Sequence, residues 1–149
     1  MKLFFRLNLF LFSLVVLSCN HSKSVSSTND NQPTYFIIGS GGGFTGLYTQ
    51  YKINSTGLIE TYNFNTNTYQ PYNQVNKSKV KQYFNRIEAL NLRNMSFNKP
   101  GNITDYIIVI SDNQKLNRIA WDNGSSEISP EIIAFFKEVF RFVDLPDKT

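Results

Sequence analysis

The sequence predicts an α+β domain: an antiparallel sheet of about five strands, in the order βββ-α-ββ-α, with two helices packed on one face. Short apolar or alternating segments bounded by Gly, Asn and Asp occur first as a group of three and later as a pair, which is typical of strands. Two longer segments, one after each group, have apolar residues at helical spacing. Adjacent strands with helices between the groups favour an antiparallel sheet that is covered on one side.

The first three strands are expected between residues 35 and 64. Residues 35–38 form an apolar run that ends at glycines, as a buried strand does. From Leu47 to Ile53 apolar and polar residues alternate, which predicts a half-exposed strand, and residues 58–64 resume as the third. The segment 65–75 is rich in Asn, Thr, Tyr and Gln, and it is expected to be an exposed loop.

A helix follows, because apolar residues recur on one helical face at Val80, Tyr83, Phe84, Ile87 and Leu90. A long connection is expected over 92–104. Residues 105–111 are apolar on both faces, which predicts a central strand, and 116–121 complete a hairpin with it.

The last helix has a specific start signal. Ser129 is a typical N-cap residue, and Pro130 stands at the first helical position. The apolar face that follows includes Phe136 and Val139, and the helix is expected to end near Pro146.

Three regions are expected along the chain: a signal peptide at 1–18, a flexible tether at 19–33 and a single domain at 34–145. Residues 1–18 combine a basic start with a short apolar run, as secretory signals do. The polar segment 19–33 has too few apolar residues to fold. An apolar run this short is not expected to span a membrane.

The end of the signal, Val16-Leu17-Ser18-Cys19, resembles the lipobox of bacterial lipoproteins. The resemblance implies that Cys19 carries lipid and anchors the protein to a membrane of the bacterial cell envelope, facing the periplasm or the cell surface. Leu17 departs from the pattern, because a small residue is usual two positions before the cysteine. The alternative is an ordinary signal peptide or N-terminal anchor with an incidental cysteine.

Charge and composition argue against several function classes. The formal net charge is +4, and without Lys2 and Arg6 the chain has 13 basic and 11 acidic side chains. No basic stripe is present, so nucleic-acid binding is not expected. Cys19 is the only cysteine and His21 the only histidine, and both precede the domain. We therefore expect no metal, no cofactor and no catalytic residue, because turns and ion pairs account for the domain's carboxylates. The chain is not expected to be an enzyme.

The glycine-rich stretch Ser40–Gly46 has two interpretations. It lies between two expected strands instead of opening a helix, so it does not fit a phosphate-binding loop. Clustered glycines commonly form a turn. A tight turn does not need so many glycines, which suggests a close approach by another group. We therefore also consider a protein-contacting loop formed by Gly42, Gly43, Phe44 and Thr45, bordered by Trp121 and Asp122.

Gly42-Gly43-Phe44-Thr45-Gly46 after a first strand, Asp105-Tyr106 opening a later strand, and Ile119-Ala120-Trp121-Asp122 before the last helix resemble emfourin-type proteins. These are small bacterial inhibitors of thermolysin-like metalloproteases. The resemblance spans residues 35–143 and implies a protein-binding module whose partner is a metalloprotease. A structural or envelope-assembly lipoprotein without a dedicated site remains an alternative, as does a carbohydrate-binding accessory protein that uses Tyr and Asp side chains.

Overall fold

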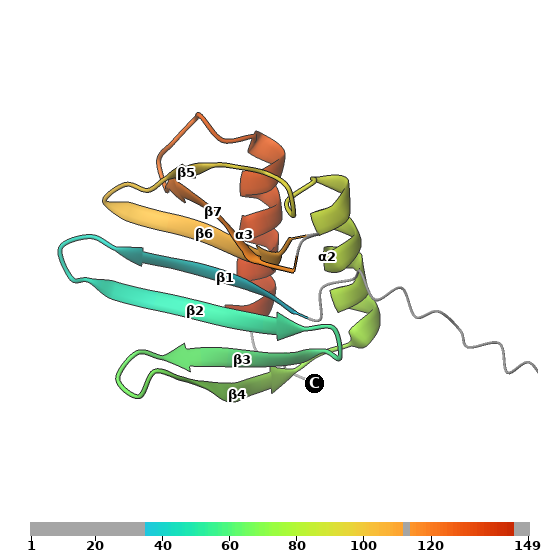
Figure 1. Cartoon of the computed structure of the whole chain (residues 1–149). Coiled ribbons are helices and arrows are strands. Elements are labelled where there is room, and N and C mark those ends of the chain that lie inside the picture. Colours follow the sequence, from blue (N-terminus) through green and yellow to red (C-terminus); the bar gives the residue numbers. More distant parts are fainter. Residues whose placement is uncertain (1–34, 112–113, 145–149) are drawn as a thin grey trace, which may run out of the picture. The chain divides into compact units, whose positions relative to one another are not determined.

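Seven strands and two helices make up residues 35–111 and 114–144, which are the residues described by the computed structural model (Figure 1). The strands are β1 (Tyr35–Gly42), β2 (Leu47–Asn54), β3 (Leu58–Asn63), β4 (Thr68–Gln74), β5 (Asn98–Lys99), β6 (Ile103–Ile110) and β7 (Leu116–Asp122). The helices are α2 (Lys77–Ala89) and α3 (Pro130–Asp144). The expected signal peptide and tether lie outside the described residues, as do the ends of the predicted domain at positions 34 and 145.

All seven strands belong to one sheet, in the order β4-β3-β2-β1-β6-β7-β5. Neighbouring strands are antiparallel except β5 and β7, which are parallel. The α+β class is therefore confirmed. The prediction of about five antiparallel strands is wrong, because the sheet is mixed and has seven.

Strand β4 was missed because its signal is polar. Residues 68–74 are the second strand of a hairpin with β3, in the segment expected to be a loop, and Tyr62 pairs with Tyr69. The hairpin turn uses Asn67 at a positive φ of 54°, a conformation that Asn tolerates better than most residues. As an edge strand, β4 has few buried positions, so apolar alternation does not mark it.

Strand β5 was missed because it is two residues long and exposed. Asn98 and Lys99 pair with Ala120 and Trp121 on β7 and add the parallel edge of the sheet. Backbone pairing alone defines this strand, and the sequence carries no pattern for it.

Both helices pack on the same face of the sheet, as predicted (Figure 1). The ring of Phe36 on β1 lies 5.3 Å from that of Phe84 on α2 and 6.4 Å from that of Phe135 on α3. Helix α3 begins at Pro130 behind the Ser129 cap, as the sequence predicts. The main core therefore lies between this face and the two helices.

Strand β6 is central and buried on both faces. Ile107 and Val109 join the main core, whereas Tyr106 belongs to a smaller cluster on the opposite face together with Ile37 and Ala120. Neither α2 nor α3 covers this opposite face, which we call the open face. The two-sided apolar character expected for residues 105–111 is therefore explained by two separate clusters.

Candidate functional site

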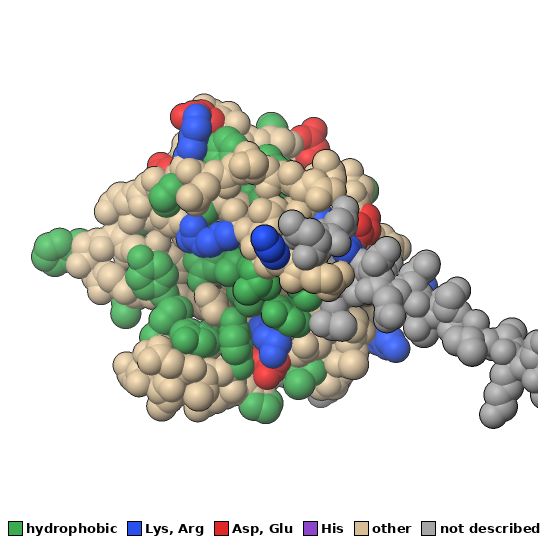
Figure 2. Space-filling model, in the orientation of Figure 1, with side chains coloured by type: hydrophobic (Ala, Val, Ile, Leu, Met, Phe, Trp, Pro, Cys, Tyr) green, Lys and Arg blue, Asp and Glu red, His purple; other side chains and the backbone are tan. Residues whose placement is uncertain are grey.

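Three connections lie together at one end of the sheet, which we call the loop end: residues 43–46, 64–67 and 100–102 (Figure 1). Gly43 N donates to the carbonyl oxygen of Asn102 at 2.6 Å, and this bond ties the first connection to the third. The surrounding segments 39–51, 61–74 and 100–104 contain no Asp, Glu, Lys, Arg or His. Figure 2 shows hydrophobic and uncharged polar side chains at the two hairpin tips. These three segments are thus uncharged, and Asp122 at the end of β7 borders them beside Gly101.

The glycines of the first connection have specific conformational roles. Gly42, Gly43 and Gly46 have φ values of 117°, 70° and 62°, in the region that favours glycine. A Cβ on Gly42 would also stand within 3.0 Å of the carbonyl oxygen of Asn102. Gly46 N donates to the carbonyl oxygen of Gly43 at 3.2 Å, which closes the turn. These glycines form a tight turn locked against a neighbouring connection.

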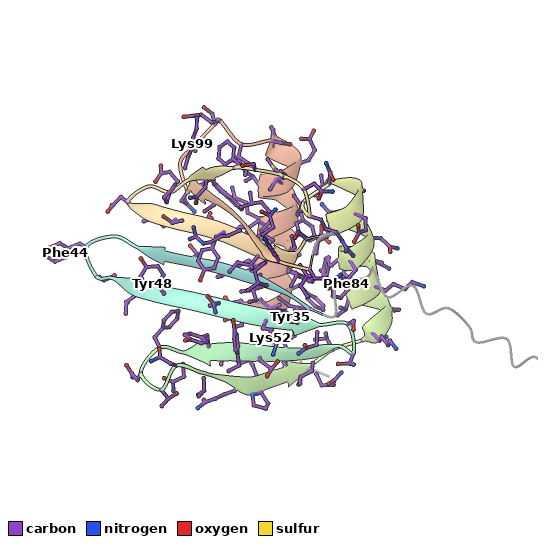
Figure 3. All side chains as sticks on the ribbon, in the orientation of Figure 1. Tyr35, Phe44, Tyr48, Lys52, Phe84 and Lys99 are labelled. Atoms are coloured by element: carbon purple, nitrogen blue, oxygen red, sulfur yellow. The ribbon has the colours of Figure 1, made fainter. Side chains whose placement is uncertain are left out.

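Phe44 projects from this turn into solvent (Figure 3). Its exposed fraction is 107%, so the ring packs against nothing in the domain. Phe44 is therefore not part of the core. A fully exposed aromatic ring on a backbone-locked turn is available to a partner.

Further exposed apolar side chains lie at the same end of the sheet as Phe44, and together with it they form what we call the loop-end surface: Phe44, Leu47, Tyr48, Phe64 and Ile103. Leu47 and Ile103 are both paired with Gly42 from opposite sides, so they share one face of the sheet. Tyr48 lies on the open face, with its ring 5.8 Å from that of Phe64. The loop end therefore presents apolar side chains on both faces of the sheet and at its tip.

On the open face behind the loop end, tyrosine side chains connect the strands through hydrogen bonds. The Tyr106 hydroxyl donates to Gln50 Oε1 at 2.7 Å, and Gln50 Nε2 donates to the Tyr69 hydroxyl at 2.6 Å. This chain of hydrogen bonds connects β6, β2 and β4, and burial raises the pKa of Tyr106 to about 12. Lys52, labelled in Figure 3, pairs with Glu60 at 2.8 Å on the same face. Side-chain hydrogen bonds and an ion pair thus connect the strands that carry the loop end.

The remaining predicted site residues have different positions. Thr45 is exposed beside Phe44, and Asp122 is partly buried at the end of β7, next to Gly101. Trp121 is only 1% exposed, and its ring lies 5.2 Å from that of Phe136 in the main core. The structure therefore brings Gly42, Gly43, Phe44 and Thr45 together at the tip, and it places the Trp121 ring where no partner can reach it.

Four residues of the loop-end surface were missed by sequence reasoning: Leu47, Tyr48, Phe64 and Ile103. Leu47, Tyr48 and Phe64 lie in expected strands, where apolar residues are normally core, and Ile103 lies in the connection expected over 92–104. The available signal was the absence of charge over both 39–51 and 61–74, which only the pairing of β2 with β3 shows to be one surface.

Within the described residues there is no group of three or more His, Cys, Asp or Glu side chains that could hold a metal ion. Neither α2 nor α3, the helices of the described part of the chain, has the length and apolar character needed to cross a membrane.

No model of a known protein family matches the chain, and no curated protein matches its sequence. The resemblances to lipoproteins and to emfourin-type inhibitors therefore stay predictions.

Proposed function

We propose that this domain is a protein-binding module that contacts its partner through the loop-end surface, with Phe44 at the centre. The observation that carries the proposal is the complete exposure of Phe44 on a turn fixed by the bond from Gly43 N to Asn102 O. A rigid turn loses little conformational freedom on binding, so more of the contact energy contributes to affinity.

The composition of the loop end supports this proposal. Interface centres are enriched in aromatic residues and depleted of charged ones. The loop-end surface contains three aromatic and two aliphatic side chains, and its segments have no charge. A large exposed apolar patch on a soluble domain is typical of an interaction site.

The proposal includes a membrane anchor. Lipid on Cys19 would hold the protein at the bacterial cell envelope, and the polar segment 19–33 would separate the domain from the membrane. The module then acts on proteins at the membrane surface.

A metalloprotease is the first partner to test, because the resemblance to emfourin-type inhibitors includes Gly42, Gly43, Phe44 and Thr45. The loop end presents apolar groups on both faces and at its tip, and such a projecting surface suits insertion into a concave site. An inhibitor would be expected to slow cleavage without being cut at the turn.

The test is a comparison of three proteins: the full chain, Phe44→Ala and Leu116→Ala. Leu116 is a matched control, because it is also an exposed apolar residue but begins β7 at the opposite end of the sheet. Each protein is used to capture partners from detergent extracts and is titrated into a thermolysin-like protease assay.

Phe44→Ala should weaken binding of the identified partner by roughly 30-fold, equivalent to about 2 kcal/mol, whereas Leu116→Ala should not change it. A partner that binds both variants equally well would contradict the role of the loop end. Partner binding without inhibition would keep the binding module and exclude the inhibitor.

A further inference from the structure

A solvent-open cavity of about 590 Å³ lies between the sheet and α3, on the helix-covered face. This volume is in the range of small-molecule sites. Its walls include three polar residues from the sheet and the loop after β7, and two phenylalanines and an arginine from α3: Ser40, Asp105, Asn123, Phe136, Phe140 and Arg141. The cavity shares no residue with the loop-end surface.

Asp105 is the distinctive residue of this cavity, since it is only 3% exposed. It accepts a hydrogen bond from Ser40 Oγ at 2.6 Å and another from Asn123 Nδ2 at 2.8 Å. These bonds connect β1, β6 and the loop after β7, and they fix the carboxyl group in place. One bond goes to each oxygen, so each retains acceptor capacity.

The carboxyl group of Asp105 has no ion pair with any described residue. The ion pairs of the described chain involve other carboxylates: Glu60, Glu88, Glu127 and Glu138. A buried carboxylate is normally paired with a cation or a metal, because two neutral hydrogen bonds replace only part of its hydration. Asp105 therefore offers, at the wall of a cavity, a buried carboxyl group with which no described cation pairs directly.

The rest of the cavity limits what could pair with this charge. Phe136 and Phe140 supply an apolar wall, with ring centroids 5.3 Å apart. Lys137, Arg141 and Asp144 line it from the exposed side of α3, where water screens their charges. The buried part of the site is thus anionic and apolar, whereas its rim carries both signs of charge.

We propose that this cavity binds a small molecule that carries a primary ammonium group on an apolar body. The ammonium group donates to the Asp105 carboxylate, and the apolar body lies against Phe136 and Phe140. A charge-assisted hydrogen bond of this kind is stronger than a neutral one. The proposal does not depend on the loop-end surface or on any protein partner.

The test uses two probes of the same shape, phenethylammonium and 2-phenylethanol. Each is titrated into the full, isotope-labelled chain in detergent, and the backbone amide shifts are followed by NMR. The ammonium probe should shift the amides of Asp105, Asn123 and Arg141 saturably, with an affinity at least tenfold higher than that of the alcohol. Equal affinities, shifts centred elsewhere, or no saturable binding up to the solubility limit would each overturn the proposal.

Two variants test whether the Asp105 carboxylate causes the preference for the ammonium probe. Asp105→Asn keeps the size of the side chain but removes its charge, so it should lower the affinity for phenethylammonium to that of the alcohol. Asp122→Asn removes a carboxylate that does not line the cavity, and it should leave both affinities unchanged. If Asp105→Asn binds the ammonium probe as tightly as the unaltered chain does, the proposal is wrong. Should this variant fail to fold, the comparison of the two probes on the unaltered chain still decides the question.

Discussion

The phenol ring of Tyr106 occupies the space above Gly39, where any β-carbon would stand within 3.0 Å of the ring. The two residues are paired across β1 and β6 on the open face. Tyr48 lies over Gly41 in the same way from β2. Two of the glycines in and before the glycine-rich stretch therefore serve packing, because they let aromatic rings lie across β1.

The variant Gly39→Ala should lower the free energy of unfolding by about 1–3 kcal/mol, the usual cost of overpacking. The Tyr106 ring would have to shift, although it is buried and its hydroxyl is bonded to Gln50. This cost outweighs the stabilisation of about 0.4–1 kcal/mol that Gly→Ala brings by restricting the unfolded chain. Urea unfolding measures the difference.

Repeating Gly39→Ala in a Tyr106→Ala background provides the control. Without the ring the three atoms nearest to the added methyl group are gone, so a coupling energy of about 0.5–3 kcal/mol is expected. An equal loss in both backgrounds would show that the ring does not cause the strain.

Phe136→Ala should lower the free energy of unfolding by about 3–5 kcal/mol, because it leaves a void in the main core. Phe136 is 5% exposed and contacts Trp121 and Phe140. The matched control is Phe44→Ala, the same chemical change at a fully exposed site, which should alter stability by less than about 0.5 kcal/mol. Similar losses for both variants would contradict the assignment of core and surface.

The tyrosines make stability fall at high pH. Burial raises the pKa of Tyr51, Tyr83 and Tyr106 from 10.0 to about 12, with Asp144 adding to the effect at Tyr51. The folded state thus holds these protons more tightly than the unfolded chain does. The stabilisation is complete below pH 10.0 and is lost as the pH rises through about 12.

Absorbance titration of the phenol groups and denaturant unfolding at several pH values test this expectation. Part of the tyrosine signal of the folded protein should ionise only near the alkaline unfolding transition, and Tyr106→Phe should make the loss of stability shallower. A single ionisation step for all tyrosines at the ordinary phenol pKa, in the folded state, would refute it.

Cys19→Ala should release the protein from membranes or leave the signal unprocessed, because the acyl attachment site would be lost. Membrane fractionation and the mass of the mature chain report the two effects. Cys19→Ser, which replaces the thiol with a hydroxyl group of similar size, should behave in the same way. Normal processing with unchanged membrane retention in both variants would exclude lipid on Cys19.

Much of the fold could be predicted because its elements have strong local signals. The start of α3 follows from Ser129 and Pro130, and the buried face of α2 follows from the spacing of Val80, Phe84 and Ile87. The two missed strands lack such signals: β4 is a polar edge strand, and β5 consists of two exposed residues. A strand defined only by backbone pairing has no side-chain pattern to reveal it.

The candidate site was predicted only in part, because the turn has a local sequence signal whereas the exposure of its side chains does not. The sequence by itself determined the turn, because Gly42, Gly43 and Gly46 accept backbone conformations that other residues resist. It also determined the α+β class through the two periods of its apolar residues. Only the tertiary structure decided that Phe44 faces solvent while Trp121 is buried, since both are aromatic residues, one just after a strand and the other within one. Exposure depends on which strands pair and which face the helices cover, and these contacts join residues far apart in the chain.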